Sequence, residues 1–600
     1  MAELIPPKWD LYLESLYNEL LGRVSDVYGR FYSDLEKFQP DGASRRRLFK
    51  FREFGLFVQD DWKILPRLTL NAGVRYERYG APTEGNGLQG ALDKGGGMNI
   101  VNRLTDISAK KGLPYYNADN NNFAPRLGFA WDVRGNGKTA IRGSWGVLYE
   151  RLINATLTPA DLNVPGLTTD ARVMPNSTGA DTRIGDGIPA LPKPAAPVVM
   201  APLDRQQTVF AMKPDLRTGY VLHTSFTIQQ EIFRNTVIEA GYVGTRGVKL
   251  FMHTNVNQPR IYEDFLTAFR QVQAYRANRT PGPSSNVLVR MWGTPDAAIS
   301  QLGGSNFDNG AVGSVANVVD TTYYSRYAAA GLPATYLRNY PQFNVANIGT
   351  NDGRSYFDSF QLTFRRQQGA LRFNANYTFG KSIDNWPNEG NGTDTASVMD
   401  WFNPALSRGR SDFDKPHSFN SSFSYTLPVG SKKRFLGSAP GWVDSLLGGW
   451  EAGVLNIWQS GTTFSVYSGR ATGPNQSANT WANFSGDRQT GKLERRGDGV
   501  YFFTEDVKAR FSFPEAGFVG NSGRNTFRGP RYFNIDASLL KRFRVTESAR
   551  ATLRVEGYNL FNNANFGTPG GSLATLQSLG KFSGTTSTAR VVQMALRFDF

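Results

Sequence analysis

Residues 411–417 carry the side-chain types that nucleophilic or acid–base catalysis uses. These groups are a hydroxyl, two carboxylates and an imidazole, from Ser411, Asp412, Asp414 and His417. The sequence has 3 histidines and no G-x-S-x-G nucleophile elbow, so a Ser-His-Asp site lacks its usual setting. We predict that this run is a polar turn, that the protein has no catalytic residues, and that it is not an enzyme.

A second group of residues offers the hard oxygen ligands that Ca²⁺ prefers. Its members are Asp384, Asn385, Glu389, Asn391, Asp394 and Asp400. Their spacing does not follow the D-x-[DN]-x-[DN]-G pattern of a calcium loop, and no cysteine is present to bind zinc or an iron–sulfur cluster. We predict a solvated polar loop, with a loop calcium site as the alternative, and no resident metal or cofactor.

The segment 135–139, Gly-Asn-Gly-Lys-Thr, ends like a phosphate-binding loop. A Walker loop needs glycine where Asp132 stands and a helix afterwards, whereas a strand pattern follows here. We therefore predict a hairpin turn. The basic clusters at 45–47 and 432–434 need no specific ligand, and a barrel would place the second on its periplasmic side.

The clearest structural pattern is a two-residue alternation of apolar and polar side chains, which predicts β-strands with one face of each kind. In 371–379 the apolar set is Leu371, Phe373, Ala375, Tyr377 and Phe379. About thirteen such segments occur, each near the length of about 9–11 residues that a tilted strand needs to cross a bilayer. They are 54–63, 68–76, 126–133, 139–149, 222–232, 236–243, 357–366, 371–379, 419–427, 450–460, 533–543, 549–561 and 589–600.

Short turns and long polar connections alternate between these segments. The long ones are 80–125, 150–220, 245–356, 381–416, 461–531 and 562–588. Only 428–449 is too long for the rule, and 245–356 has room for a further strand pair or for a helix around Phe265, Phe269 and Val272. The alternation is typical of an outer-membrane β-barrel, with short periplasmic turns and long extracellular loops. We expect an all-β, antiparallel transmembrane barrel in the outer membrane.

The last strand predicts an assembly signal. Its alternate residues are Val592, Met594, Leu596, Phe598 and the terminal Phe600. Outer-membrane barrels end in such an alternation with a terminal aromatic, which resembles the signal read by their insertion machinery. Aromatics also fall at both ends of the strands, with tryptophans at the periplasmic ends and tyrosines mostly at the other, as interfacial girdles do. The girdle residues are Trp62, Trp131, Trp450, Tyr76, Tyr79, Tyr149 and Trp458.

Composition and charge exclude several other classes of protein. A mean hydropathy of -0.40 and the lack of any run of about 18 apolar residues exclude a helical membrane protein. The 67 basic and 51 acidic residues give a net charge of +16, but the basic residues are scattered without a nucleic-acid-binding motif. We expect no nucleic-acid partner. Residues 1–8 have no signal-peptide pattern, so either the protein is cytosolic or its true beginning lies upstream.

Four sequence blocks together resemble TonB-dependent receptors, and the last three resemble the Oar-like branch. The blocks are 57–77 (FVQDDWK…LTLNAGVRYE), 409–417 (GRSDFD with His417), 520–530 (GNSGRN with RGP) and 556–562 (EGYNLFN). They span about residues 50–600. We assign 51–600 to an Oar-like barrel portion and 1–50 to an atypical N-terminal segment.

This resemblance implies a 22-stranded barrel for uptake of an unidentified substrate, with a plug that TonB displaces. Nothing before residue 50 resembles a plug or a TonB-contact peptide, so we expect the C-terminal portion of such a barrel, with TonB engaged through N-terminal parts not seen here. Outer-membrane lipid and lipopolysaccharide are further expected partners, because basic residues would favour phosphates or anionic cargo. The alternatives are a passive porin-like or structural protein, a non-functional fragment, and a secreted β-rich enzyme.

Overall fold

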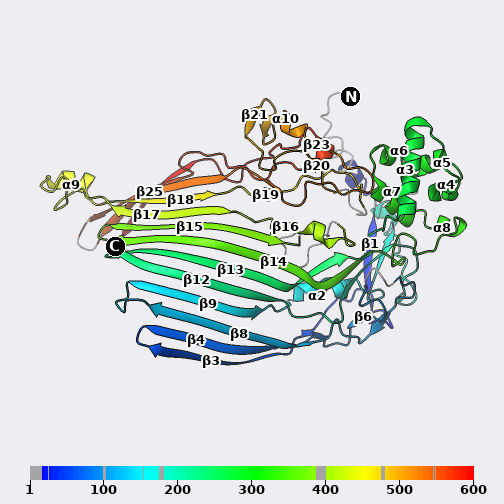
Figure 1. Cartoon of the computed structure of the whole chain (residues 1–600), viewed down its shortest axis with the longest axis horizontal. Coiled ribbons are helices and arrows are strands. Elements are labelled where there is room, and N and C mark those ends of the chain that lie inside the picture. The colour runs from blue at the N-terminus through cyan, green and yellow to red at the C-terminus, as the bar shows by residue number, and fades with distance from the viewer. Residues whose placement is uncertain are drawn as a thin grey trace.

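A computed structural model describes residues 16–24, 26–98, 103–152, 154–173, 182–386, 400–473, 480–544, 546 and 549–600. Its main feature is one broad sheet in which long strands follow one another in sequence order, from β3 at one edge to β27 at the other (Figure 1). These strands are β3 (Glu53–Leu65), β4 (Leu68–Tyr79), β8 (Asp119–Asp132), β9 (Thr139–Tyr149), β12 (Tyr220–Phe233), β13 (Thr236–Asn255), β14 (Phe343–Gln368), β15 (Leu371–Asp384), β17 (His417–Thr426), β18 (Trp450–Gln459), β25 (Tyr532–Arg544), β26 (Arg550–Tyr558) and β27 (Val591–Asp599). Every predicted strand is confirmed.

The sheet keeps its apolar residues on one face across the strand register. Directly paired residues of an antiparallel ladder share a face, and Phe373 of β15 pairs with Phe423 of β17, as Leu596 of β27 pairs with Leu553 of β26. Large apolar side chains on this face are exposed, which a protein in water would avoid and which lipid would cover. The opposite face carries polar residues such as Arg372 and Asn374.

This assignment of faces predicts opposite effects for two neighbouring residues of β18. Val454 pairs with Phe423 and Ala537 on the apolar face, whereas Leu455 lies on the other face although it is itself apolar. We expect Val454→Arg to destabilise the sheet in lipid by about 2–4 kcal/mol, because its charge enters the bilayer midplane. Leu455→Arg should be tolerated. Urea unfolding of each variant in lipid vesicles measures the difference, and equal losses would contradict the assignment.

The two ends of the sheet differ. At one end the strands are joined by short turns, such as the predicted β8–β9 hairpin, where Asp132 accepts hydrogen bonds from the amides of Gly135 (2.9 Å) and Gly137 (2.8 Å). The β17–β18 connection at this end carries α9 (Gly441–Leu447) and the 432–434 basic cluster. Trp62, Trp131 and Trp450 lie near this end, and Tyr76, Tyr79, Tyr149 and Trp458 lie near the other. By the rule for outer-membrane barrels, the short turns face the periplasm.

The long connections form a structured layer at the exterior end. Its strands are β1 (Val27–Tyr32), β2 (Phe49–Lys50), β5 (Thr83–Glu84), β6 (Gly90–Leu92), β7 (Ala109–Lys111), β10 (Thr168–Val173), β11 (Gln207–Met212), β16 (Gly409–Arg410), β19 (Thr463–Phe464), β20 (Asn483–Phe484), β21 (Glu494–Arg496), β22 (Gly499–Tyr501), β23 (Phe511–Ser512) and β24 (Phe527–Arg528). Its helices are α2 (Asn154–Leu162), η3 (Ile184–Asp186), α3 (Glu263–Asn278), α4 (Val287–Trp292), α5 (Pro295–Leu302), α6 (Gly304–Asp308), α7 (Val312–Thr321), α8 (Arg326–Ala329), η4 (Pro404–Ser407), α10 (Glu505–Lys508) and η5 (Leu573–Thr575).

The exterior layer adds two features to the predicted antiparallel sheet. The short strand β11 joins β14 in parallel. Strands β13 and β14 are also much longer than predicted, since they continue past the apolar band and pair with each other up to Asn255 and Asn347. The extension stays paired because buried backbone N–H and C=O groups need hydrogen-bond partners. Strand β11 supplies those partners on the edge of β14 that faces away from β13.

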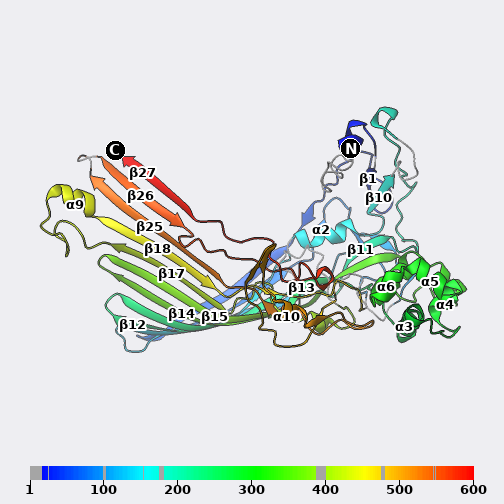
Figure 2. The ribbon, with the colours of Figure 1, turned by 90° about the horizontal axis from the view of Figure 1, so that it is seen from above.

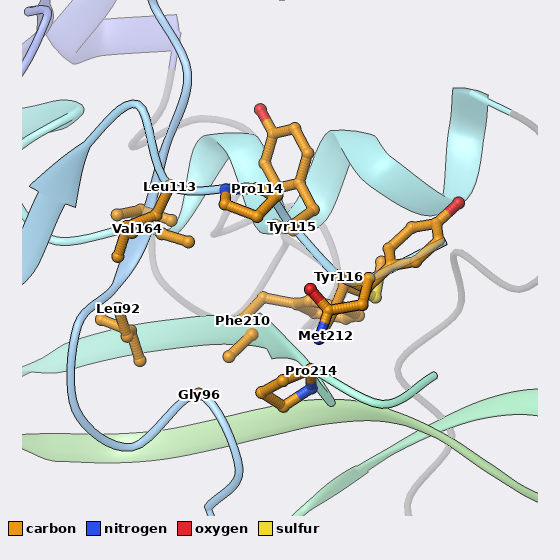
Figure 3. A pocket seen from close by; sticks show the side chains of 14 residues that line it. Leu92, Gly96, Leu113, Pro114, Tyr115, Tyr116, Val164, Phe210, Met212 and Pro214 are labelled. Atoms are coloured by element: carbon orange, nitrogen blue, oxygen red, sulfur yellow. The ribbon is translucent and has the colours of Figure 1, made fainter. Parts of the chain in front are cut away.

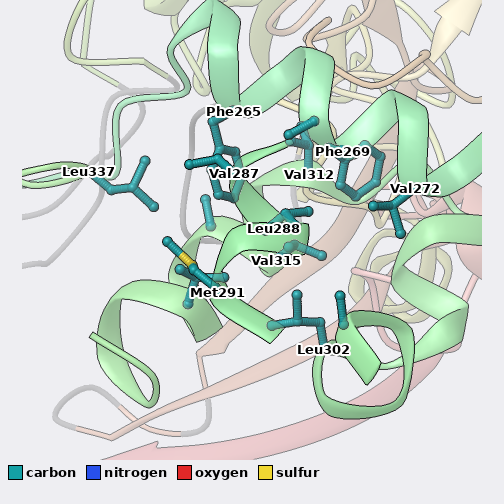
Figure 4. Close-up of a cluster of buried hydrophobic side chains, with 14 of the residues drawn as sticks. Phe265, Phe269, Val272, Val287, Leu288, Met291, Leu302, Val312, Val315 and Leu337 are labelled. Carbon is teal, nitrogen blue, oxygen red and sulfur yellow. The ribbon is translucent and has the colours of Figure 1, made fainter. Parts of the chain in front are cut away.

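The connection between β13 and β14 folds into a helical module, defined here as α3 to α8 (Figure 4). Of the two possibilities for this segment, the helix is the right one, and Phe265, Phe269 and Val272 are among its buried residues. Polar caps fix the helix starts: Asn286 accepts from two amides at the start of α4, and Thr294 caps α5. None of the described helices is long and apolar enough to cross a membrane.

The sheet curves into an open wall (Figure 2). Within the described residues β3 pairs with β4 alone and β27 with β26 alone, and the residues of both edge strands are exposed along their whole length. The C-terminus lies at the short-turn end of the wall and the helical module at the other end. The well-buried clusters lie in the exterior layer, so the loops have cores of their own while the wall relies on its surroundings.

Candidate functional site: the exterior rim

Two of the sequence blocks that carry the family resemblance meet at the exterior rim. Arg524, from the 520–530 block, donates to Asp384 Oδ1 at 2.5 Å and to Asp412 Oδ2 at 3.4 Å. It also donates to the carbonyl oxygens of Trp386 (3.0 Å) and Ser407 (3.3 Å). Its side chain is 2% exposed. A guanidinium with this many acceptors is a fixed structural centre.

Asp414 is the second centre of this contact. Its carboxylate accepts hydrogen bonds from the Ser382 amide (2.7 Å), Arg410 (3.1 Å) and Arg528 (2.7 Å). Asn525 bridges the same segments, donating to the Arg410 carbonyl (2.8 Å) and to Asp412 (2.5 Å). We name this set the arginine latch: Asp384, Asp412, Asp414, Arg524, Asn525 and Arg528. It ties the β18–β25 connection to the β15–β17 connection.

Removing one neutral member of the latch tests this role. We expect Asn525→Ala to loosen the β18–β25 connection by about 1–3 kcal/mol, because it leaves buried partners without hydrogen bonds. Hydrogen exchange of the amides in 480–530 measures the loss. Asn521→Ala is a nearby control, since Asn521 is exposed and its side chain accepts one hydrogen bond, from the Phe484 amide. An unchanged exchange rate in Asn525→Ala would exclude the latch as the tie.

The residues considered for catalysis do not assemble into a triad. The His417 Nδ1 atom lies 2.7 Å from the Tyr377 hydroxyl, and the Ser411 hydroxyl lies 2.8 Å from that of Ser382. Asp414 is engaged by the latch instead. The polar-turn interpretation describes these contacts, with the addition that Ser411 and Asp414 are buried and that the latch cross-links the turn.

The six residues considered as calcium ligands do not come together as a site in the part of the chain that the structure describes. Glu389, Asn391 and Asp394 lie outside the described residues. Asp384 binds Arg524, Asn385 Oδ1 accepts from the Arg354 amide at 2.8 Å, and Asp400 Oδ1 accepts from the Phe402 amide at 2.8 Å. Across the part of the chain that the structure describes, no group of three or more acidic, His or Cys side chains is placed to hold a metal.

The latch borders a large cavity of about 1010 Å³, which we name the rim cavity. Six basic side chains line it: Lys381, Arg408, Arg410, Arg488, Arg524 and Arg528. Asp487 is the one carboxylate among the described residues of its lining. The rim cavity is therefore suited to an anionic group.

A smaller pocket of about 180 Å³ lies between the β6–β7 and α2–β11 segments (Figure 3). Tyr115, Phe210 and Met212 give it an apolar lining without charged side chains. The Tyr115 hydroxyl donates to Asp161 (3.1 Å), which also binds Arg45 and Arg47. Two members of the 45–47 basic cluster thus neutralise a buried carboxylate.

The geometry of a wall with one apolar face agrees with the comparison to known families. The model of the outer membrane beta barrel domain matches residues 13–593. The chain belongs to this outer membrane beta barrel family. Its location is the outer membrane, and its apolar face is the face toward lipid. No curated protein matches the sequence.

Solved outer-membrane proteins are similar to this barrel chain at low sequence identity. The outer membrane transporter YddB of Escherichia coli is 11% identical with a TM-score of 0.42, and the match covers 92% of this chain and 45% of that one. The ferripyoverdine receptor of Pseudomonas aeruginosa is 10% identical, with a TM-score of 0.39 and coverages of 94% and 40%. The ferric enterobactin receptor PfeA of the same species is 9% identical, with a TM-score of 0.38 and coverages of 92% and 45%. The barrel chain spans less than half the length of each.

Sequence reasoning found the latch segments as motifs but missed the rim cavity. The sequence of β15 does contain one residue that could have indicated the position of the cavity. The alternation that places Phe379 toward lipid continues to Lys381, so a lysine occupies the apolar register at the end of the strand. A charged residue in that register marks the place where the lipid-facing surface leaves the hydrocarbon.

Proposed function

We propose that this chain forms the wall of an outer-membrane uptake barrel of the TonB-dependent, Oar-like kind, and that it is not an enzyme. The observation that carries the proposal is the structured layer built by the long connections at the exterior end. A layer with its own cores offers a fixed surface for cargo above a polar inner face. Its substrate is unidentified.

The inner face supports passage of a hydrated solute. Its polar side chains connect across three strands, where Thr363 donates to Asn376 Oδ1 at 3.0 Å and Asn376 donates to Asn420 Oδ1 at 3.0 Å. Such a ladder satisfies polar groups without apolar packing and leaves further acceptors for water. Arg372 extends the same face in β15.

The partners follow from this proposal. TonB would act through a plug in the whole protein, the insertion machinery would read the strand ending in Phe600, and lipid and lipopolysaccharide would surround the apolar face. The boundary near residue 50 is part of the proposal. Residues 27–50 belong to the exterior layer, where β1 pairs with β10 and β2 with β5.

Uptake can be tested without knowing the cargo. Cells with the gene, cells lacking it and cells lacking TonB are grown in one complex medium, and the depletion of its compounds is followed by mass spectrometry. We expect at least one compound whose depletion requires both the gene and TonB. If no compound depends on the gene, the uptake function is wrong.

The second candidate is a passive porin-like protein, which would have a polar inner face as well. In that case depletion would require the gene but not TonB. Single-channel recording of the whole protein, isolated from the outer membrane, gives an independent result, since a passive pore conducts steadily whereas a plugged barrel stays closed.

A further inference from the structure

The rim cavity borders the lipid-facing side of the wall. Phe379 of β15 pairs with His417 of β17, and both share the apolar face. Since side chains alternate along a strand, Lys381 and Ile383 lie on the same face as Phe379. All three residues that border the cavity from the long strands, Lys381, Ile383 and His417, therefore lie on the face toward lipid.

An aromatic cluster directly below the cavity marks the membrane interface. The ring of His417 lies 4.9 Å from that of Phe379 and 6.2 Å from that of Trp458, centroid to centroid. Tyr377 completes the cluster through its hydroxyl bond to His417. Aromatic girdles of barrels sit at the level of the lipid head groups. The cavity, one step further toward the exterior, is level with the outer part of those head groups.

The cavity holds cationic groups that no residue within the described part of the chain neutralises. The Lys381 ammonium and the Arg408 guanidinium make no hydrogen bond or ion pair with any residue that the structure describes, and Arg408 lies 6.0 Å from the Tyr356 ring. Arg410 and Arg528 share the single carboxylate of Asp414. Arg488 donates to the Asn521 carbonyl at 2.9 Å. An anion in the cavity would balance this excess of positive charge.

We propose that the rim cavity binds the phosphate-bearing head group of an outer-leaflet lipid, with Lys381 and Arg408 as its ligands. A phosphate offers the charge and the acceptor oxygens that these side chains bind best. A lipid is favoured over a soluble anion because the cavity lies above the girdle and borders the apolar face at Lys381, Ile383 and His417. This inference rests on the outer-membrane location and not on TonB-dependent uptake.

Native mass spectrometry of the full chain in detergent micelles tests the proposal, with diphosphoryl lipid A as the probe and phosphatidylcholine and inorganic phosphate as comparisons. The chain should retain lipid A in preference to both. The double variant Lys381→Gln/Arg408→Gln should bind lipid A at least about tenfold more weakly. The matched control is Arg365→Gln/Arg372→Gln, which removes the same charge from the inner face and should change binding by no more than about twofold.

Three results would overturn the inference. Equal losses in the two double variants would show attraction by net charge alone. Inorganic phosphate bound as tightly as lipid A would assign the cavity to a soluble anion. Unchanged binding in Lys381→Gln/Arg408→Gln would place the lipid elsewhere. Each variant is checked for folding by heat-modifiable mobility on a gel, and the uptake assay is read separately, so that failure of one proposal does not decide the other.

Discussion

Replacing Asp320 with asparagine is expected to open the helical module while the wall stays folded. Asp320 and Arg338 form an ion pair in which both side chains are fully buried. Asp320 also accepts from the Tyr327 hydroxyl (2.8 Å) and lies 3.7 Å from Arg205 Nε. Asparagine has nearly the same shape, so the change leaves two buried guanidinium groups without a counter-charge. Breaking such a pair costs about 3–5 kcal/mol.

The site of the pair explains why the effect should spread through the module. Arg338 also donates to Asn317 Oδ1 of α7 at 2.6 Å and to the carbonyl oxygens of Asn257 (3.0 Å) and Asn344 (2.5 Å). It therefore joins the module to the ends of β13 and β14. Burial raises the pKa of Tyr327, which keeps its hydroxyl protonated as a donor to Asp320.

Hydrogen exchange of the α7 amides measures the loss of protection in Asp320→Asn. The matched control is Asp308→Asn, which breaks the exposed pair between Arg276 and Asp308 (2.7 Å) in the same module. An exposed pair contributes about 0–1 kcal/mol, so α7 should stay protected in the control. Equal exchange in the two variants would contradict a central role for the buried pair.

The wall could be predicted from the sequence because lipid imposes one rule on every strand. One face must be apolar, so each strand carries a period of two that can be read locally, as in 371–379. The order of the strands followed as well, since short turns allow only neighbouring strands to pair, as at Gly135 and Gly137. The strand ends that lie in the exterior layer could not be predicted from the sequence. They are outside the membrane, so lipid does not require one of their faces to be apolar.

The latch and the parallel pairing of β11 with β14 show what the sequence did not reveal. Arg524 forms an ion pair with Asp384, and Gln207 pairs with Phe343. The partners are far apart in the sequence, and no local periodic pattern indicates either contact. Such contacts depend on how loops pack on one another, and the loop segments have their own cores. A motif such as 520–525 therefore indicated a family but not its partner segment.

The terminal residue offers a test of assembly that is separate from stability. Phe600 continues the apolar alternation of β27, but its side chain is 97% exposed. Its deletion therefore removes almost no contact within the chain. Any large effect must come from a partner that reads the end of the strand. We expect cells that express the chain without Phe600 to lose most of the folded protein from the outer membrane.

Two measurements separate recognition from folding. Heat-modifiable protein in outer-membrane fractions reports assembly in cells, and refolding of the purified chain into lipid vesicles reports the intrinsic tendency to fold. Deleting Phe600 should lower the first and leave the second nearly unchanged. Phe561→Ala is the matched control, because Phe561 is another exposed phenylalanine, away from the terminal alternation, and its loss should change neither. If vesicle refolding of the deletion variant falls as much as assembly in cells, Phe600 acts through the stability of β27 and the assembly signal is wrong.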